Sequence, residues 1–391
     1  MRNTYGLCFY LCLAVGGPAL AVDSSVTVAD IRYASGIDNQ LSLSARIAYP
    51  PSGSKLPVLV VMHGLREQAS SIHDDALKRM ATAYGNGAFV IAVELRGRGK
   101  SDGSPDVGGR EIQDIVDAIH FVLNHYQPLT DPNQIHIAGY SGGGGNAMSC
   151  AARYPDTFNT VTSFFGISDY GFDARYGWYE VASPGQQAFL RRWIGGTPTE
   201  KPDAYRSRAS ILAIGNYSGG FLYLFHDRQD GNVPLIQSGR VAELMAASGL
   251  HNFRLSITDN NDNPRWTHSA PNGNAGVIGA ENIFLPDIVG KKIKPWIIPA
   301  AGTLKVAGYV ETKRFGVWLG DGTAGFATVT YDAAKATFSI VPESGPVNWT
   351  LTLRDSKPNV KTAIVVNGKR YSALADRHGT VSVQGTVNKG R

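Results

Sequence analysis

Hydrophobic and polar positions alternate in two different ways along this chain. From Val22 to about Pro299, short apolar runs are separated by stretches with helical periodicity, which is typical of a mostly parallel sheet with helices on both faces. The apolar runs predict strands at 42–49, 58–62, 89–93, 135–138, 161–165, 221–225 and 254–257. Helices are expected at 112–126, 142–154, 236–248 and 280–293. The segment 169–216 interrupts the alternation and predicts an irregular helical insertion over the sheet edge.

After Pro299 the pattern changes to short β-type runs separated by turn signals, of which Asn367-Gly368 is the strongest hairpin signal. Residues 301–391 are therefore expected to form a small, accessory, sandwich-like all-β domain that follows a larger α/β domain at 22–300. Trp318 and Trp349 lie in apolar runs, which favours positions in the core of this domain. Exposed positions would instead suit binding of a polymeric substrate.

The N-terminus has the pattern of an export signal. Arg2 precedes an apolar stretch at 7–15, and Ala19-Leu20-Ala21 is a small-x-small cleavage site. We expect residues 1–21 to be removed after Ala21 and the mature protein to be secreted or periplasmic. Since no later segment approaches about 20 apolar residues, no membrane span is expected.

Composition narrows the function classes. Hydrophobic residues make up 43 % and charged residues 18 %, so a sizeable core is available. The net charge of +5 has no Lys/Arg block behind it, and nucleic-acid binding is not expected. Cys150 is the only cysteine outside the signal, which excludes an intramolecular disulfide in the mature chain and favours a buried thiol. With no His-x-x-x-His, Cys pair or phosphate loop, neither a metal nor another cofactor is expected.

The strongest chemical signal is Gly139-Tyr140-Ser141-Gly142-Gly143, which lies between a predicted buried strand and a helix of small residues. This is the context of a G-x-S-x-G nucleophile elbow, in which a sharp strand-to-helix turn carries an exposed serine. The flanking glycines avoid the clash that a Cβ would cause in so tight a turn. Ser141 is therefore the expected nucleophile.

A serine nucleophile needs a histidine base and an acid that orients it, in the chain order Ser, Asp, His for this fold. The acid is expected in the loop after the strand at 221–225, where Asp230 fits best because it has the H-x-x-x-D-x-x-V-P spacing of such loops, and Asp227 is the alternative. His268 is the expected base, because its loop follows the strand at 254–257. The other histidines lie upstream of the nucleophile, at the start of the loop that holds Asp230, before the strand at 254–257, or in the β-domain.

The remaining parts of the site are backbone donors and a substrate pocket. The oxyanion hole needs two N–H groups, expected from Gly142 and from Leu65 in the loop after the strand at 58–62. Aromatic residues near the nucleophile and in the insertion are candidates for the pocket, with an ordinary hydrophobic cover as the alternative reading. These candidates are Tyr140, Tyr170, Trp178, Tyr179 and Trp266.

Over about residues 57–299 the chain resembles the α/β-hydrolase superfamily, closest to the prolyl-oligopeptidase-type (S9) catalytic domain and related esterases. The resemblance is carried by the elbow, His63-Gly64, Arg96-Gly97-Arg98-Gly99, Asp131-Pro132, Ser168-Asp169 and Gly195-Gly196-Thr197-Pro198. It implies the same roles for Ser141, Asp230, His268, Gly142 and Leu65. The chain departs from the family where Leu65-Arg66 replaces Gly-Pro and where Asp227 replaces a glycine.

We therefore expect a secreted serine hydrolase that works through an acyl-enzyme intermediate, with an ester favoured over a peptide substrate. The stretch before Pro57 is too short for the β-propeller with which family peptidases bind peptide termini. Two alternatives stay open. One is a serine peptidase without a propeller, and the other is a binding protein that keeps the fold without the activity.

Overall fold

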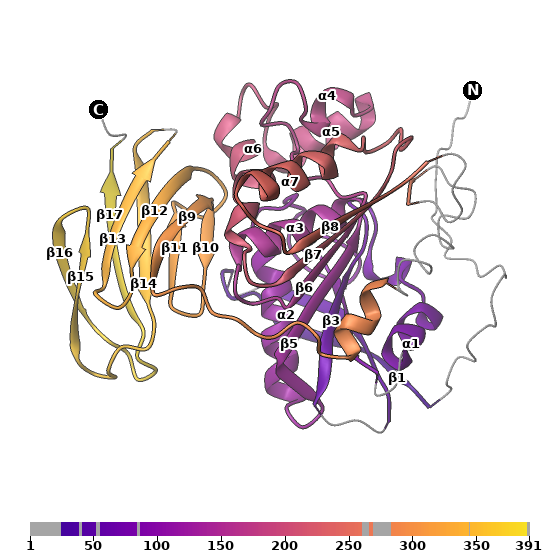
Figure 1. Cartoon of the computed structure of the whole chain (residues 1–391), viewed down its shortest axis with the longest axis horizontal. Coiled ribbons are helices and arrows are strands. Elements are labelled where there is room, and N and C mark those ends of the chain that lie inside the picture. Colours follow the sequence, from indigo (N-terminus) through magenta and orange to yellow (C-terminus); the bar gives the residue numbers. More distant parts are fainter. Residues whose placement is uncertain are drawn as a thin grey trace.

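The computed structural model describes residues 25–38, 41–51, 55–83, 87–259, 266–268, 283–343 and 345–388. The export signal predicted at 1–21 lies outside these residues. The described chain forms an eight-stranded sheet with helices around it and a separate nine-stranded sheet at the C-terminal end (Figure 1). No helix within these residues is long and apolar enough to cross a bilayer.

The larger sheet has the strand order β1-β2-β4-β3-β5-β6-β7-β8. Its strands are β1 (Thr27–Ala34), β2 (Ser42–Tyr49), β3 (Leu56–Met62), β4 (Phe89–Glu94), β5 (Thr130–Tyr140), β6 (Thr160–Phe164), β7 (Phe221–Asp227) and β8 (Phe253–Thr258). β1, β2 and β4 pair antiparallel, and all pairs from β4 through β8 are parallel. This confirms the predicted α/β-hydrolase fold.

Helices cover both faces of this sheet because its central strands are apolar on both sides. Along β3, Val58, Val60 and Met62 pack into the core shared with α2 (Glu111–His125), α3 (Gly142–Arg153) and α7 (Ile236–Ala247). Leu59 and Val61 face the opposite core, which contains α1 (Asp74–Thr82) and the helical residues 283–289. The last helix ends before Gly290, earlier than the predicted 293, and its predicted start at 280 lies outside the described residues.

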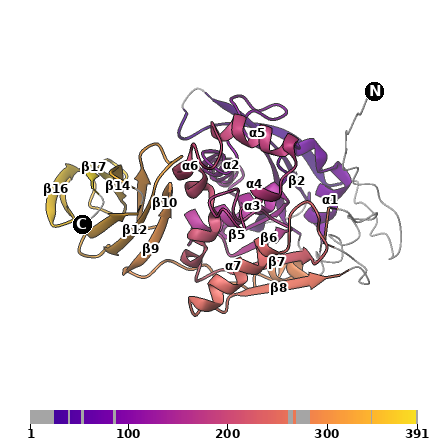
Figure 2. The same ribbon diagram turned by 90° about the horizontal axis from the view of Figure 1, so that it is seen from above.

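The interrupting segment is helical, as predicted. It holds α4 (Trp178–Val181), α5 (Pro184–Ile194) and α6 (Pro202–Arg208), which lie together above the sheet (Figures 1 and 2). α5 begins at a capping box in which Ser183 and Gln186 satisfy each other's backbone N–H, and it ends at the left-handed Gly195. The segment has its own small core, so it is a packed layer rather than a loose loop.

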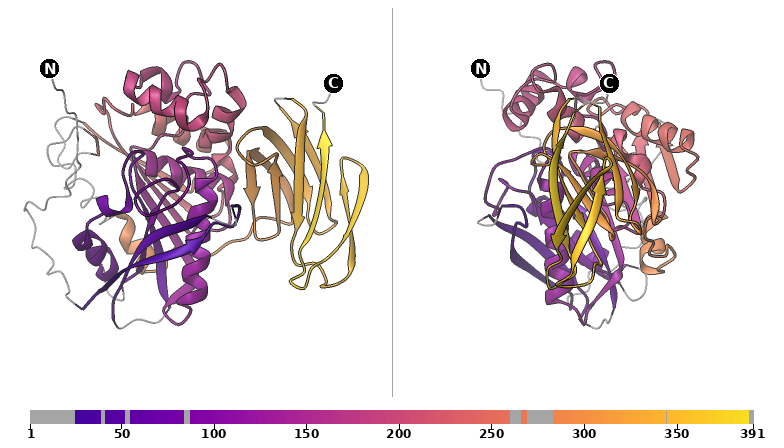
Figure 3. Two further views of the ribbon diagram at one scale, coloured as in Figure 1. Left: turned by 180° about the vertical axis from the view of Figure 1, so that it is seen from behind. Right: turned by 90° about the vertical axis from the view of Figure 1, so that its left-hand side faces the viewer.

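The nine-stranded sheet forms the β-domain, with the order β16-β15-β13-β12-β9-β10-β11-β14-β17. Its strands are β9 (Ala301–Ala307), β10 (Tyr309–Glu311), β11 (Phe315–Leu319), β12 (Phe326–Asp332), β13 (Thr337–Pro342), β14 (Val347–Leu353), β15 (Lys361–Val366), β16 (Lys369–Leu374) and β17 (Val381–Val387). The sheet curls (Figure 3), so that a Cβ on Gly385 of β17 would lie 3.1 Å from the Tyr371 hydroxyl of β16. Trp349 is 3 % exposed and packs in the enclosed core.

The β-domain is joined to the hydrolase sheet by polar contacts that are themselves buried. Arg153, the last residue of α3, donates to the carbonyl oxygens of Gly109 (2.8 Å), Ser207 (2.7 Å) and Ala307 (3.1 Å). Its guanidinium lies over the ring of Tyr309, which stacks on Trp318 with 4.1 Å between ring centroids. The helix that follows the nucleophile therefore ends directly against the β-domain.

Candidate active site

Ser141 sits in a strained turn between β5 and α3. Its backbone has φ 56° and ψ −121°, a conformation that side chains other than glycine rarely adopt. The turn is fixed because the Ser141 N–H donates to the Phe164 carbonyl at 2.9 Å. A Cβ on Gly139 would lie 2.2 Å from the Gly143 carbonyl oxygen, and one on Gly143 would lie 2.5 Å from that of Met62. The glycines of the motif are thus required by space.

The backbone nitrogens of Gly142 and Leu65 belong to segments in close contact. A Cβ on Gly142 would lie 2.8 Å from the Leu65 nitrogen and 2.6 Å from the Leu65 Cβ. The loop that carries Leu65, here called the oxyanion loop, is held by hydrogen bonds close to this residue. His63 Nδ1 donates to the Gly64 carbonyl at 2.8 Å, and the Gly64 N–H donates to Glu67 at 3.0 Å. The two N–H donors expected from the sequence therefore lie on facing, rigid segments.

Asp230 and His268 form a buried pair. His268 Nδ1 donates to Asp230 Oδ2 at 2.7 Å, while the other carboxylate oxygen accepts from the N–H groups of Asn232 (2.9 Å) and Val233 (3.0 Å). Burial raises the pKa of Asp230, but the bond from His268 and these N–H groups outweigh burial and hold it below its usual value. Asp230 is therefore ionised at neutral pH and fixes the orientation of the imidazole.

The two acid candidates from the sequence have different partners. Asp227, at the end of β7, accepts from the Thr258 hydroxyl and from the Gln229 N–H, both at 2.8 Å. The first bond ties the end of β7 to the end of its parallel neighbour β8, and the second fixes the start of the loop after β7. The geometry thus brings Asp230 to His268 and leaves Asp227 in a bracing contact at the strand ends.

Ser141 and His268 both contact the end of β6. The Phe164 carbonyl receives the Ser141 N–H, and the next residue, Phe165, lies edge-on to the His268 ring with 4.5 Å between centroids. Phe165 has φ 39°, so the chain is strained at the point where it turns this ring toward His268. The serine and the histidine therefore converge on one edge of the sheet from β5 and from the loop after β8.

The aromatic pocket candidates are mainly packing residues in this structure. Tyr170, Trp178 and Tyr179 are buried in the core of the insertion, Trp266 is buried against Phe225, and Tyr140 is half-buried with its ring stacked on Phe164. Trp178 also donates its indole N–H to the Asn232 carbonyl at 2.7 Å, two residues beyond Asp230. The insertion is thus tied to the acid loop, and a role of these rings in the substrate pocket stays a prediction.

Two charged residues at the site were not singled out from the sequence. Glu67 follows the expected oxyanion donor, and burial raises its pKa while the charge of His268 acts in the opposite direction. Arg98 donates to the Leu65 carbonyl from the loop after β4. The departure at Leu65-Arg66 was the only signal in the sequence that this loop differs from its relatives.

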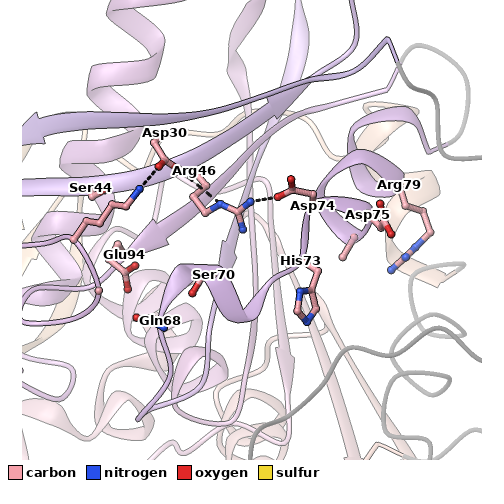
Figure 4. Close-up of a pocket in the computed structure, with 13 residues that line it drawn as sticks. Asp30, Ser44, Arg46, Gln68, Ser70, His73, Asp74, Asp75, Arg79 and Glu94 are labelled. Atoms are coloured by element: carbon pink, nitrogen blue, oxygen red, sulfur yellow. Dashed lines mark hydrogen bonds and ion pairs between the residues drawn. The ribbon is translucent and has the colours of Figure 1, made fainter.

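A polar cavity of about 840 Å³ lies behind the oxyanion loop (Figure 4). Arg46 is ion-paired with Asp30 and Asp74 on its wall, and Glu94 accepts from the Ala69 N–H at 3.0 Å at its inner side. Burial raises the pKa of Glu94. These side chains bond to one another and to the backbone at Ala69. We infer that the wall of the cavity stabilises the oxyanion loop.

Cys150 lies on α3 among core residues, and burial raises the pKa of its thiol. A thiol that stays protonated is a poor nucleophile. Cys150 is therefore a packing residue.

The eight-stranded sheet, the strained serine at its edge and the Asp230–His268 pair define a serine hydrolase of the α/β-hydrolase fold. Residues 76–280, more than half of the chain, match the sequence profile of the prolyl oligopeptidase family. The chain belongs to this family.

The names of two relatives of the chain describe different activities. It is 24 % identical over 202 residues to an uncharacterized peptidase of Bacillus subtilis (YtmA), covering 52 % of this chain and 74 % of that protein. It is 27 % identical over 191 residues to a poly(3-hydroxybutyrate) depolymerase of Ralstonia pickettii, covering 42 % of this chain and 38 % of the depolymerase.

A similar fold occurs in the acylaminoacyl peptidase of Pyrococcus horikoshii, with a TM-score of 0.57 and 23 % identity. The match covers 70 % of this chain and 43 % of that peptidase. The chain thus spans less than half the length of the depolymerase and of the acylaminoacyl peptidase. The family match at residues 76–280 lies before the β-domain.

Proposed function

We propose that this protein is an exported hydrolase that cleaves carboxylic esters through an acyl-enzyme intermediate. Ser141 attacks the ester carbonyl, and His268 takes the serine proton and later gives it to the leaving alcohol. Asp230 holds the imidazole in the required orientation. The N–H groups of Gly142 and Leu65 stabilise the oxyanion, and water then releases the acid and restores Ser141.

The observation that carries this proposal is the 2.7 Å bond between His268 and a fully buried Asp230 side chain, at the sheet edge where Ser141 is strained. Burying a carboxylate next to a histidine costs free energy, so a protein retains such a pair where the pair has a role. A strained, half-buried serine at the start of a helix is likewise retained at functional sites more often than elsewhere.

The choice of an ester over an amide rests on weaker support. The similarity to a depolymerase from Ralstonia pickettii, whose name describes a polyester substrate, favours an ester. The peptidases among the relatives and structural neighbours favour an amide, so a peptidase is the second candidate.

A fluorophosphonate probe tests the nucleophile. The purified mature protein should be labelled at Ser141, because such probes trap activated serines. Ser141→Ala should lose the label and about 10⁴–10⁶ in the rate of hydrolysis. Ser382→Ala, an exposed serine of the β-domain, is the matched control and should keep both. Labelling at another serine would refute the assignment.

A substrate panel tests the reaction. Short and medium acyl esters and blocked dipeptide amides should be compared by kcat/KM on the same preparation. Faster turnover of the esters, after correction for their higher intrinsic reactivity, supports the proposal. Turnover of peptides alone would replace it by the second candidate.

Export is a separate part of the proposal and rests on the N-terminal sequence. Protein recovered from the periplasm or the medium should begin at Val22 in N-terminal sequencing. An intact N-terminus on protein confined to the cytoplasm would contradict export.

A further inference from the structure

Two arginines stack on neighbouring aromatic rings beside the oxyanion loop. The guanidinium carbon of Arg66 lies 5.5 Å from the ring centroid of Phe189, and that of Arg98 lies 4.3 Å from the centroid of Trp193. Both rings are on α5, one helical turn apart, with 4.7 Å between their centroids. The insertion and the oxyanion loop therefore hold two guanidinium groups next to each other, and we call these four residues the arginine–aromatic wall.

The two positive charges repel each other. The pKa of Arg98 is lowered by burial and also by the charge of Arg66, although two carboxyls, Glu111 and Glu94, act in the opposite direction. Those carboxyls have other hydrogen-bond donors: Glu111 accepts from Gly108 at 2.6 Å, and Glu94 accepts from Ala69. Bringing like charges together without a direct counter-ion costs free energy, which an anionic ligand would recover.

Donor capacity remains on this wall. Arg98 uses one Nη to hold the Leu65 carbonyl, while its Nε is buried without a hydrogen-bond partner. Among the described residues, the ion pairs of the arginines do not include Arg66 or Arg98. Arg66 is exposed and therefore open to a ligand from solvent. Stacking on an aromatic ring fixes the plane of a guanidinium and leaves its N–H edge available.

The arginine–aromatic wall adjoins the residue whose N–H is the proposed oxyanion donor. Arg98 bonds to the carbonyl of Leu65, whose own N–H is the proposed oxyanion donor, and Arg66 is the next residue in that loop. Glu67 lies two residues after Leu65 in the same loop, where burial raises its pKa. An anion at the wall would thus lie close to the backbone that carries the proposed oxyanion donor.

We propose that Arg66 and Arg98 bind a carboxylate carried by the substrate, so that the preferred ester is an anionic one. A planar, bidentate guanidinium is suited to a carboxylate. This inference rests on the proposed ester hydrolysis and specifies its substrate class, such as the carboxyl end of an oligomeric hydroxy acid or a monoester of a dicarboxylic acid.

Matched ester pairs test both ends of the substrate. For the acyl side, 4-nitrophenyl hydrogen adipate is compared with 4-nitrophenyl hexanoate. For the leaving group, 4-carboxyphenyl butyrate is compared with 4-carbamoylphenyl butyrate. We expect kcat/KM for the anionic member to exceed that of its neutral match by about 10-fold in at least one pair. Salt should reduce this preference, because Arg66 is exposed to solvent.

Arg66→Gln should lower the anionic-to-neutral ratio of that pair by about 10-fold. Arg377→Gln, an exposed arginine of the β-domain, is the matched control and should leave the ratio unchanged. A melting curve of each variant checks that it is folded. A ratio that is unchanged in Arg66→Gln would overturn the inference.

The outcomes separate this inference from the proposed function. If Ser141 is labelled and all four esters are cleaved without preference for an anionic member, the carboxylate site is wrong and the ester hydrolase stands. If Ser141 is labelled and none of the esters is cleaved, the ester assignment falls and the inference falls with it. If Ser141 is not labelled, the nucleophile assignment itself fails.

Discussion

The two sheets of this protein differ most in what they bury. The hydrolase part encloses polar and ionisable side chains on nearly every element around its sheet, among them His63, Glu94, Glu111, Asp114, His136, Arg153, Asp227 and Asp230. In residues 301–388, as far as the structure describes them, Thr312 is the only polar side chain that is buried. The contrast follows the strand patterns: β4 is buried throughout, whereas β13 alternates strictly between exposed and buried positions.

Burying a polar group without a partner costs free energy, so a region keeps many of them only where they hold something in place. In the hydrolase part they hold the oxyanion loop, the acid loop and the junction with the β-domain. The β-domain is built like an ordinary packed sheet, with apolar residues inside and polar residues outside. The difference indicates that the hydrolase part carries the chemistry and that the β-domain contributes packing.

The largest effect should come from the acid that faces the histidine. Asp230→Asn keeps the size of the side chain but removes the charge that orients His268, and we expect kcat to fall by about 10⁴. Asp227→Asn should cost far less activity, because its partners are Thr258 and Gln229. Steady-state kinetics of both variants checks this, and a reversed order would make Asp227 the acid of the site.

The next effect tests the junction between the two regions. Arg153→Met should lower the free energy of unfolding by about 3–5 kcal/mol, because three buried carbonyl groups lose their donor. The control is Arg354→Met in the β-domain, whose side chain is 33 % exposed in its pair with Glu311 and should cost about 1 kcal/mol or less. Urea unfolding of both variants measures the difference. Equal losses would mean that the junction is no more important than a partly exposed ion pair.

Acid should destabilise the hydrolase part first. Burial lowers the pKa of His63 to about 4 and that of His136 to about 3. Below about pH 6.5 these histidines take up protons only in the unfolded chain, so stability falls as the pH drops from about 6.5 toward 4. Each should contribute about 3 kcal/mol of this loss by pH 4. The β-domain has one histidine, His378, which is exposed.

His136→Gln provides the measurement for this pH effect. The difference in unfolding free energy between pH 7 and pH 4.5 should be smaller in the variant by about 2–3 kcal/mol, whatever its stability at neutral pH. The comparison of the two pH values removes the general cost of a core substitution. An unchanged pH dependence would show that His136 does not oppose protonation in the folded chain.

The smallest effect concerns the contact between the insertion and the acid loop. Trp178→Phe removes the bond to the Asn232 carbonyl and should cost about 1–2 kcal/mol in stability together with some of kcat, since the loop that holds Asp230 becomes less rigid. Trp349→Phe, in the core of the β-domain, should cost a similar amount of stability without loss of kcat. Equal kcat values in the two variants would show that Trp178 does not affect the site.

Most of the fold could be predicted from the sequence because the strands of the larger sheet are short apolar runs between turn signals. β1 was missed, since Asp30 and Arg32 interrupt its apolar residues and it is an edge strand paired only with β2. In the β-domain the hairpin signal at Asn367-Gly368 is confirmed, because it joins β15 to β16, an edge strand whose side chains are mainly exposed or half-buried.

The parts of the candidate site that depend on local sequence could be predicted. The elbow at Ser141 needs its glycines, and the acid and histidine loops follow identifiable strands. The preference for Asp230 over Asp227 could be predicted from its spacing to His226 and to Val233-Pro234, and in the structure Asp230 bonds to His268 while Asp227 ends β7. The arginine–aromatic wall was not predictable, since it joins residues from the loop after β3, the loop after β4 and α5.

The buried contact of Arg153 has a consequence for the order of events during synthesis. Two of its carbonyl partners, on Gly109 and Ser207, leave the ribosome with the hydrolase part, whereas the third, on Ala307, belongs to the first strand of the β-domain. Until that strand emerges, the guanidinium at the end of the nucleophile helix lacks a partner that it has in the finished protein. The hydrolase part therefore completes the packing at the end of α3 only once β9 is in place.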